Sequence, residues 1–333
     1  IAHAAIVAAE LGGVERPSLT LSRALALFVE ETGDRRVGMS DNQRRKWTAP
    51  RRKAVAAFVA AVADKPLEDI TRADALTFRA ALRQRVEAGQ INAASANKSL
   101  GHLSDVYATV AQLHALDAPN PFARLRLRET AQAQRPSFAT EWIRQKLLAP
   151  GALDGMNPEA RDTLLMIVNT GAGIAEVCGA RLEDVRLEGE TPFLRIAAHP
   201  GRQLKTAHRG RDIPLLGVSL EAARRRAAAG GFPRYHDGPD RLSAALNKFL
   251  RENHLLPTPQ HSVYSLRHAF QDRMIAAEFP DRLQSDLMGH RFHRPRYGAG
   301  PTIEQTAKWM ALIARSRRPR RRRGFRCAAP RPA

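Results

Sequence analysis

Apolar residues in the first third of the chain recur at the spacing of a helix. Leu21, Leu25 and Phe28 lie three and four positions apart, which places their side chains on one helical face. A second helix with an apolar face is predicted to end before Lys65-Pro66, because proline cannot continue a helix. These faces are expected to pack together as the core of a helical domain over residues 20–122.

Two more helices are predicted within this domain. Thr71 and Asp74 have the spacing of a capping box, in which side chains satisfy backbone donors at a helix start. The helix that they open carries Leu76 on its predicted apolar face. A further apolar run from Leu100 to Val110 predicts a fourth helix, which Asn120-Pro121-Phe122 is expected to stop.

The pattern changes after the helical domain. Residues 123–137 are polar without an apolar period and are predicted to be a linker, and residues 138–314 are predicted to form a second domain. Its helices are predicted over Glu159–Asn169, Asp240–His254 and Ser265–Glu278. Between Pro192 and Leu215 the period shifts toward two, which predicts three short antiparallel strands. The predicted fold class is therefore mainly α with a small antiparallel sheet, that is, α+β.

The two ends of the sequence differ from these domains. Residues 1–19 are expected to be an incomplete N-terminal segment, because the sequence starts with Ile1 and not with methionine. They also lack the basic start of a signal peptide. Residues 315–333 consist mainly of arginine, proline and small residues, and they are expected to be a disordered basic tail.

Charge narrows the class of partner. The net charge is +20, and the nine arginines from Arg315 onward leave +11 on residues 1–314, so the body of the protein is itself basic. Such a field attracts polyanions, first nucleic acid and then acidic membranes. The longest apolar stretch, Ala54 to Ala63, is too short to span a bilayer. Two distant cysteines argue against a disulfide framework and favour a reducing compartment.

The residues that indicate a specific chemistry lie near the C-terminus. Arg267 lies in Ser-Leu-Arg-His-Ala-Phe, His290 follows a glycine, and Tyr297 ends Arg-Pro-Arg-Tyr. This spacing of arginine, histidine and tyrosine resembles the catalytic box of tyrosine recombinases, the phage-integrase family. Members of that family cut a DNA strand with a tyrosine hydroxyl, hold the 3′-phosphate covalently, and let a 5′-hydroxyl of another strand reverse the attack. They need no metal.

The resemblance implies a role for each matched residue. Tyr297 matches the nucleophile, and Arg267 matches an arginine whose planar fork holds two phosphate oxygens. His290 matches a position that hydrogen-bonds the scissile phosphate. Lys205 lies in a segment similar to the family's β-hairpin, whose lysine protonates the departing 5′-oxygen. Tyr264 stands where the family most often has histidine, and its phenol can still hydrogen-bond a phosphate oxygen.

One position departs from the family pattern. The pattern is Thr-Gly-x-Arg-x-x-Glu, and this chain has Thr170, Gly171 and Glu176 but Gly173 where the arginine belongs. Loss of one preorganised charge donor costs roughly 10²- to 10³-fold in rate. Two hypotheses therefore stay open. The protein is a site-specific recombinase that integrates a mobile element, or an impaired relative that binds DNA without efficient cleavage.

The resemblance also implies an architecture and partners. A helical core-binding domain at 20–122 and a mixed α/β catalytic domain at 138–314 would clamp double-stranded DNA at attachment-type sites. Exposed cations along phosphates would supply most of the affinity. The side chains predicted to bind DNA are Arg44, Arg45, Arg51, Arg52, Lys98 and Arg211. Family members act as homotetramers, some with accessory DNA-bending proteins, and the helix near 302–314, opened by a Thr302–Gln305 capping box, is a candidate for exchange between protomers.

Two other chemistries are not favoured. Glycines 171 and 173 resemble the start of a dinucleotide-binding loop, but Glu176 stands at the third glycine position and would repel a pyrophosphate. The later histidines, His261, His268, His290 and His293, lack the spacing of metal ligands. We therefore expect no cofactor, no metal and no membrane partner. The expected location is the cytoplasm, on the nucleoid, for a bacterial or phage-derived chain.

Overall fold

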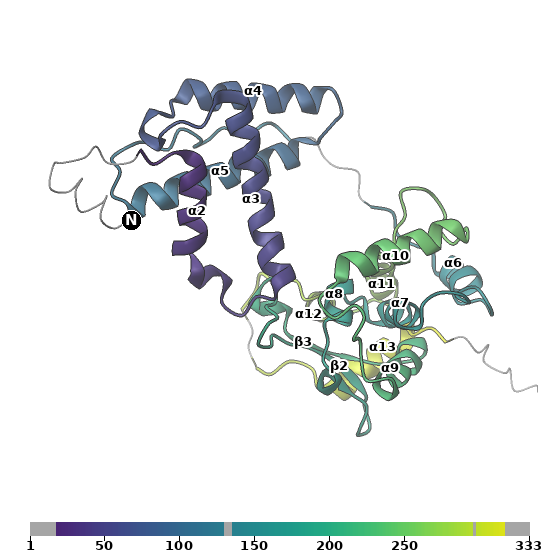
Figure 1. Cartoon of the computed structure of the whole chain (residues 1–333). Helices are drawn as coiled ribbons and strands as arrows, with labels where there is room; N and C mark the ends of the chain where they lie inside the picture. Colours follow the sequence, from purple (N-terminus) through teal and green to yellow (C-terminus); the bar gives the residue numbers. More distant parts are fainter. Residues whose placement is uncertain (1–17, 130–134, 296–297, 317–333) are drawn as a thin grey trace, which may run out of the picture. The chain divides into compact units, whose positions relative to one another are not determined.

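The computed structural model describes residues 18–129, 135–295 and 298–316. The chain divides into two compact units, Ile1–Ala133 and Gln134–Ala333, which are drawn together in Figure 1 and described separately below. The predicted N-terminal segment lies almost wholly outside the described residues, and so does nearly all of the basic tail. Tyr297 also lies outside them.

The first unit is a bundle of helices (Figure 1). Its core includes the aromatic residues Phe28, Phe58, Phe78, Tyr107 and Phe122. Its elements are α2 (Leu21–Glu31), η1 (Gly33–Arg36), α3 (Asp41–Val62), η2 (Leu67–Asp69), α4 (Arg72–Glu87) and α5 (Ala93–Leu113). Phe58 packs edge-on against Phe78 and Phe122, with ring centroids 5.5 and 5.2 Å apart. Edge-to-face pairs of this kind add stability beyond the apolar area that they bury. The helical interpretation of this part of the chain is confirmed.

Local signals in the sequence set most helix ends of this unit. The predicted capping box opens α4: the Thr71 amide donates to Asp74 at 2.9 Å, and the Asp74 amide donates to Thr71 Oγ1 at 3.2 Å. The prediction for Leu76 is wrong, because it is exposed while its neighbour Ala75 is buried. One position along a helix turns a side chain by about 100°, enough to move it off the core face. The fourth helix was predicted to stop at Asn120-Pro121-Phe122, but α5 ends earlier, at Leu113.

The segment that follows α5 packs onto the same unit. Leu125 and Leu127 are buried in its core, although the sequence pattern placed them in a polar linker. The Asn97 side chain donates to the Leu127 carbonyl at 3.0 Å, and its oxygen accepts from the Leu127 amide at 2.7 Å. These two hydrogen bonds hold an extended stretch whose apolar residues alternate, a pattern too short to read from the sequence. Residues 130–134 lie outside the described part of the chain.

The second unit is mainly helical, with a small sheet. Its elements are α6 (Thr140–Trp142), the π-helical turn η3 (Ile143–Leu147), α7 (Pro158–Thr170), α8 (Ile174–Cys178), η4 (Leu182–Asp184), β1 (Val185–Arg186), β2 (Phe193–Ile196), η5 (Ala207–Arg209), β3 (Arg211–Pro214), α9 (Val218–Ala228), α10 (Pro239–Glu252), α11 (Ser265–Ala276), α12 (Asp281–Met288) and α13 (Ile303–Ile313). Every residue from Thr163 to Thr170 is buried, and α7 packs against α8, α9, α10 and α11. A helix buried on all sides forms the centre of the core.

The sheet is antiparallel with the order β1-β2-β3. Only β2 and β3 lie between Pro192 and Leu215, so the prediction of three strands there is wrong in position. The intervening residues form a turn bridged by His199 and Arg202, followed by the 3₁₀ turn η5. The third strand is β1, whose two residues are too few to show an alternating pattern. The predicted fold class, mainly α with a small antiparallel sheet, is confirmed.

The last helix packs on its own unit. Its predicted capping box is present, with Gln305 N donating to Thr302 Oγ1 at 3.2 Å. Met310 and Ile313 are buried, and Arg273 donates to the Ile313 carbonyl at 2.8 Å. Exchange of this helix between protomers stays a prediction. No helix of the described residues is long and apolar enough to cross a membrane.

Candidate functional site

The turn between α7 and α8 contains two glycines with different structural needs. Gly171 has φ +59°, and a Cβ there would lie 2.3 Å from Phe270 Cδ1, so only glycine fits. Gly173 has φ −70° and ψ 151°, which any residue can adopt. A Cβ at Gly173 would meet the Glu176 carboxylate at 3.5 Å, an ordinary contact. The fold therefore does not require glycine at position 173.

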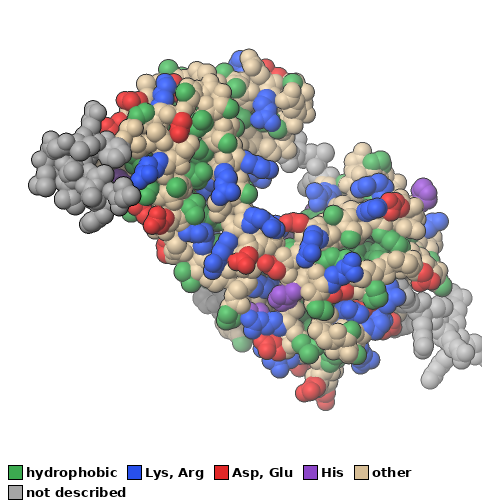
Figure 2. All heavy atoms as spheres, viewed as in Figure 1, with side chains coloured by type: hydrophobic (Ala, Val, Ile, Leu, Met, Phe, Trp, Pro, Cys, Tyr) green, Lys and Arg blue, Asp and Glu red, His purple; other side chains and the backbone are tan. Residues whose placement is uncertain are grey.

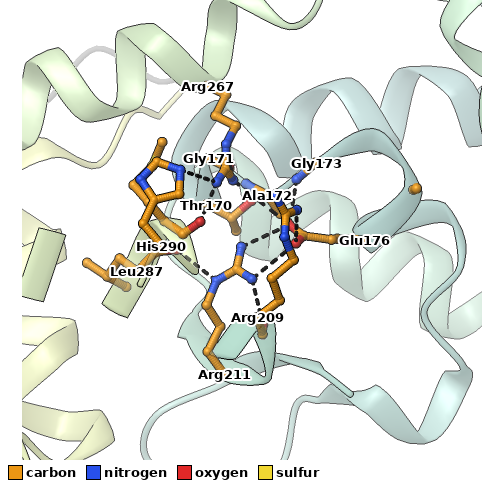
Figure 3. Close-up of polar contacts among 12 residues, drawn as sticks. Thr170, Gly171, Ala172, Gly173, Glu176, Arg209, Arg211, Arg267, Leu287 and His290 are labelled. Atoms are coloured by element: carbon orange, nitrogen blue, oxygen red, sulfur yellow. Dashed lines mark hydrogen bonds and ion pairs between the residues drawn. The ribbon is translucent and has the colours of Figure 1, made fainter. Parts of the chain in front are cut away.

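Glu176 lies at the centre of a group of cations (Figure 3). Its carboxylate accepts hydrogen bonds from Gly173 N at 2.8 Å, Arg211 Nη2 at 2.9 Å and Arg209 Nη1 at 3.3 Å. Arg267 Nη1 lies 3.9 Å away. Burial alone would raise the pKa of this carboxyl, but Arg211, the Gly173 amide and Arg267 together lower the pKa to about 2. Glu176 is therefore ionised at neutral pH.

Arg267 is buried, and backbone carbonyls orient its guanidinium. Nη1 donates to the Gly171 carbonyl at 2.5 Å, and Nη2 donates to the Met288 carbonyl. Burial lowers the pKa of Arg267, and the charge of Glu176 opposes that change. These contacts fix the plane of the guanidinium between α7, α8 and α12, so that Arg267 is positioned before any ligand arrives.

His290 lies at the edge of this group. Its Nε2 accepts a hydrogen bond from Arg267 Nη2 at 3.4 Å. Burial lowers the pKa of His290, and the neighbouring Arg267, Arg209 and Arg211 lower it further. A neutral imidazole that accepts at Nε2 carries its proton on Nδ1, where it can donate to an anion. His290 also lines a cleft of about 700 Å³ whose other lining side chains include Arg282, Arg291 and Arg294.

The remaining residues predicted for the site lie in different settings. Lys205 is exposed in the connection between β2 and β3. Tyr264 directly precedes α11 and is 44% exposed. Its ring packs edge-on against His268, with centroids 5.4 Å apart, and Arg135 lies over the ring at 5.1 Å. Among the described residues, the structure therefore brings together Arg267 and His290 of the predicted set.

Two further arginines complete the group of cations around Glu176. Arg211 was predicted to bind DNA, but its side chain is only 7% exposed. It donates to Glu176 and to the Leu287 carbonyl, which ties β3 to α8 and α12. Arg209 was not singled out at all. The only sequence signal for it was its place two residues before Arg211, and the structure puts it in the turn η5 and not in strand β3.

Comparisons with known proteins bear on the fold. No protein-family model matches the chain, and no curated protein sequence matches it. A Tn1549 transposon integrase solved with transposon right-end DNA matches with a TM-score of 0.56 at 15% identity, over 86% of this chain and 94% of that one. A lambda integrase dimer bound to a COC′ core site matches with a TM-score of 0.58 at 17% identity, over 87% and 95%. The chain has the fold of these integrases.

This integrase fold spans both units, because the matched region covers most of the chain. A lambda integrase tetramer bound to a Holliday junction also matches, with a TM-score of 0.57 at 18% identity, over 87% of this chain and 78% of that one. The resemblance to tyrosine recombinases that the C-terminal motif predicted is thereby confirmed at the level of the fold.

The first unit of the integrase fold carries the other residues predicted to bind DNA. Arg44, Arg45, Arg52 and Lys98 are exposed. Arg51 is different: its side chain is 13% exposed, pairs with Asp105 at 3.0 Å and stacks over Trp47 at 3.9 Å. Figure 2 shows many Lys and Arg side chains on the face in view. Arg51 therefore holds α3 to α5, while the exposed cations remain available to phosphates.

The described residues contain no group of three or more His, Cys, Asp and Glu that could hold a metal ion. His261, one of the histidines weighed as a ligand, is buried and hydrogen-bonds Thr258 and the Ser137 carbonyl. Cys178 is buried as well, and burial raises the pKa of its thiol to about 12. Both side chains are therefore buried within the second unit.

Proposed function

We propose that this protein is a site-specific DNA recombinase that cuts and rejoins strands through a 3′-phosphotyrosine at Tyr297, and that it integrates a mobile element. The proposal rests on the contact between Arg267 and His290. They are 23 residues apart in sequence, yet Arg267 Nη2 and His290 Nε2 lie 3.4 Å apart beside a basic cleft. A guanidinium and a neutral imidazole are the donors that a non-bridging phosphate oxygen needs as charge develops on it.

The chemistry follows from the site residues. The Tyr297 hydroxyl loses its proton to water as its oxygen attacks the scissile phosphorus, the phosphorus–O5′ bond breaks, and the departing 5′-oxygen takes a proton from Lys205. The 3′-phosphate is then esterified to the tyrosine. Arg267 and the Nδ1–H of His290 hold the non-bridging oxygens, and Glu176 keeps the guanidinium groups in place. A 5′-hydroxyl from another strand reverses the steps and releases the tyrosine.

Duplex DNA is the proposed partner. The exposed cations of the first unit and the net charge of +20 suit a polyanion, and structures with the same fold were solved on DNA. By the same analogy, the protein assembles as a homotetramer on paired attachment-type sites in the cytoplasm. Because phosphate contacts release counterions, binding should weaken steeply between 50 and 300 mM salt in a mobility-shift assay.

A second candidate function has one specific observation in its favour. Gly173 removes an arginine that the family pattern places at the scissile phosphate, and the fold does not demand glycine there. A protein with this change could occupy attachment-site DNA without cutting it. Under this second function the adduct described below forms poorly, and Gly173→Arg restores it.

A covalent trap separates the two functions. Duplexes selected from a random pool by binding to the full chain are remade with a nick beside the cleavage point, so that the cut fragment diffuses away. The proposed function predicts a protein–DNA adduct that resists denaturation, disappears in Tyr297→Phe and persists in the control Tyr235→Phe, which changes a buried tyrosine of the same unit. DNA binding without any adduct from the unaltered chain would contradict strand cleavage and leave the binding function.

A further inference from the structure

We infer that Arg209 supplies the second phosphate-holding guanidinium that the family pattern assigns to position 173. The inference rests on the proposed function and deepens it, because it names a residue that completes the site. A site with Arg267 and His290 in place lacks one cation in the α7–α8 turn, while an unassigned arginine from another segment lies beside the same turn.

The Glu176 carboxylate gives a common reference for the two positions. A side chain at Gly173 would begin 3.5 Å from Oε2 of this carboxylate. Arg209 Nη1 lies 3.3 Å from Oε1 of the same group. Figure 3 shows the guanidinium groups of Arg209, Arg211 and Arg267 converging there. Arg209, which comes from η5, therefore contacts the same carboxylate that an arginine at position 173 would lie beside.

Of the three arginines, Arg209 is the most accessible to a ligand. Its side chain is 29% exposed, compared with 7% for Arg211 and 5% for Arg267. Arg211 already donates to Glu176, to the Leu287 carbonyl and to the Arg209 carbonyl. The last of these contacts, at 2.8 Å, fixes the backbone of Arg209 itself. Arg209 is thus anchored at its main chain and open at its guanidinium.

The charge of the cluster matches this role. Three guanidinium groups around one ionised carboxylate leave a net charge of +2 beside the neutral His290. The pentacoordinate phosphate formed when a phenolate attacks a diester carries two negative charges. Arg209 makes and breaks no covalent bond in this step. It donates N–H groups to a non-bridging oxygen while the tyrosine–phosphorus bond forms and the phosphorus–O5′ bond breaks.

The first test is a swap of the arginine between the two positions, scored by the rate of adduct formation on the nicked DNA. Arg209→Ala should slow the adduct by roughly 10²- to 10³-fold, and Arg209→Lys should recover little, because a point charge cannot copy the planar fork. Gly173→Arg combined with Arg209→Ala should return the rate to within about tenfold of the unaltered chain. An Arg209→Ala rate equal to that of the unaltered chain would overturn the inference.

The matched control is Arg225→Ala. Arg225 pairs with a buried carboxylate, Asp162, at 2.7 Å, and its side chain is 38% exposed, so it shares with Arg209 a buried acidic partner and partial exposure. The control should leave the adduct rate unchanged. An equal loss of rate in both variants would show that any broken arginine–carboxylate pair slows the protein, and the inference would fail.

A second readout does not depend on cleavage. Inorganic vanadate is a phosphate analogue, so its affinity for the full chain reports on the site directly. Arg209→Ala should weaken vanadate binding at least about tenfold and raise the NMR titration midpoint of His290, since Arg209 is one of the charges that lower that pKa. If the unaltered chain forms no adduct, the proposed function fails, while vanadate affinity and the His290 midpoint still decide the role of Arg209. If neither the vanadate affinity nor the His290 midpoint changes in Arg209→Ala, the proposed role of Arg209 is refuted.

Discussion

The second unit contains two buried carboxylates, each surrounded by three arginines, and their settings differ. Asp162 on α7 pairs with Arg225 at 2.7 Å, Arg226 at 2.8 Å and Arg161 at 3.7 Å. Two of these arginines lie on α9, which packs along α7. This cluster therefore joins one pair of neighbouring helices.

The Glu176 cluster has the same charges but draws them from separate segments. Its arginines come from η5, β3 and α11, and a neutral histidine lies at its edge. The difference teaches that a count of arginines around an acid does not mark a functional site. The proposed site instead rests on the convergence of segments far apart in sequence, together with a histidine that can donate a hydrogen bond to an anion.

The largest effect should come from neutralising either acid. Glu176→Gln and Asp162→Asn each leave three guanidinium groups without their counter-ion, which should cost about 3–5 kcal/mol in the free energy of unfolding, measured in urea. The two should differ at His290. Its titration midpoint should fall further in Glu176→Gln and stay unchanged in Asp162→Asn, because the Glu176 charge raises the pKa of His290. Equal shifts in both variants would erase the distinction between the clusters.

Acid should weaken the Glu176 cluster over a defined range. The pKa of Glu176 is about 2 in the folded protein, against an ordinary value of 4.5. Between these values the unfolded chain binds more protons, so the carboxylate contributes about 3 kcal/mol of stability above pH 4.5 that is lost as the pH falls toward 2. The free energy of unfolding in urea, measured from pH 2.5 to 7, should depend less steeply on pH in Glu176→Gln than in the unaltered chain. An unchanged pH dependence would show that this carboxyl is not held ionised.

The two glycines of the α7–α8 turn give a sharper comparison inside the Glu176 cluster. Gly171→Ala should cost about 2–3 kcal/mol in unfolding free energy, because its φ is positive and its Cβ would collide with Phe270. Gly173→Ala should change that free energy by less than about 0.5 kcal/mol. Denaturant curves of the two variants test this directly. A large loss in Gly173→Ala would mean that the fold does require glycine at that position.

The smallest effects should separate paired from exposed arginines in the first unit. Arg52→Ala should weaken DNA binding modestly and reduce the slope of log affinity against log salt by about one, as expected for the loss of one phosphate contact. Arg51→Ala should instead lower the thermal midpoint, because it breaks the contacts with Asp105 and Trp47. A lowered thermal midpoint in Arg52→Ala, with a reduced salt slope in Arg51→Ala, would show that burial does not identify the structural arginine.

Much of this molecule could be predicted from short-range signals. The capping boxes at Thr71 and Thr302 opened helices as expected, because they act between residues three positions apart. Arg267 and His290 were found from the spacing of a resemblance, and the structure places them in contact. The shared integrase fold likewise agrees with the predicted class.

The rest depends on contacts that the local sequence does not encode. Arg209 and Arg211 lie more than thirty residues after Glu176, and nothing near either of them indicates that they meet its carboxylate. Strand β1 has only two residues, so it shows no period. Leu125 and Leu127 alternate over too short a stretch to stand out from a linker. Each of these features is fixed by tertiary packing.

Identifying the residue that becomes linked to DNA tests the central proposal most directly. The chain has four tyrosines, and Tyr107 and Tyr235 are buried, at 1% and 6% exposure. Tyr264 and Tyr297 are then the candidates. Mass spectrometry of the protease-digested adduct should find the 3′-phosphate remnant on the peptide that contains Tyr297. A remnant on Tyr264, or no remnant on any tyrosine peptide from DNA that the protein binds, would contradict strand transfer through Tyr297.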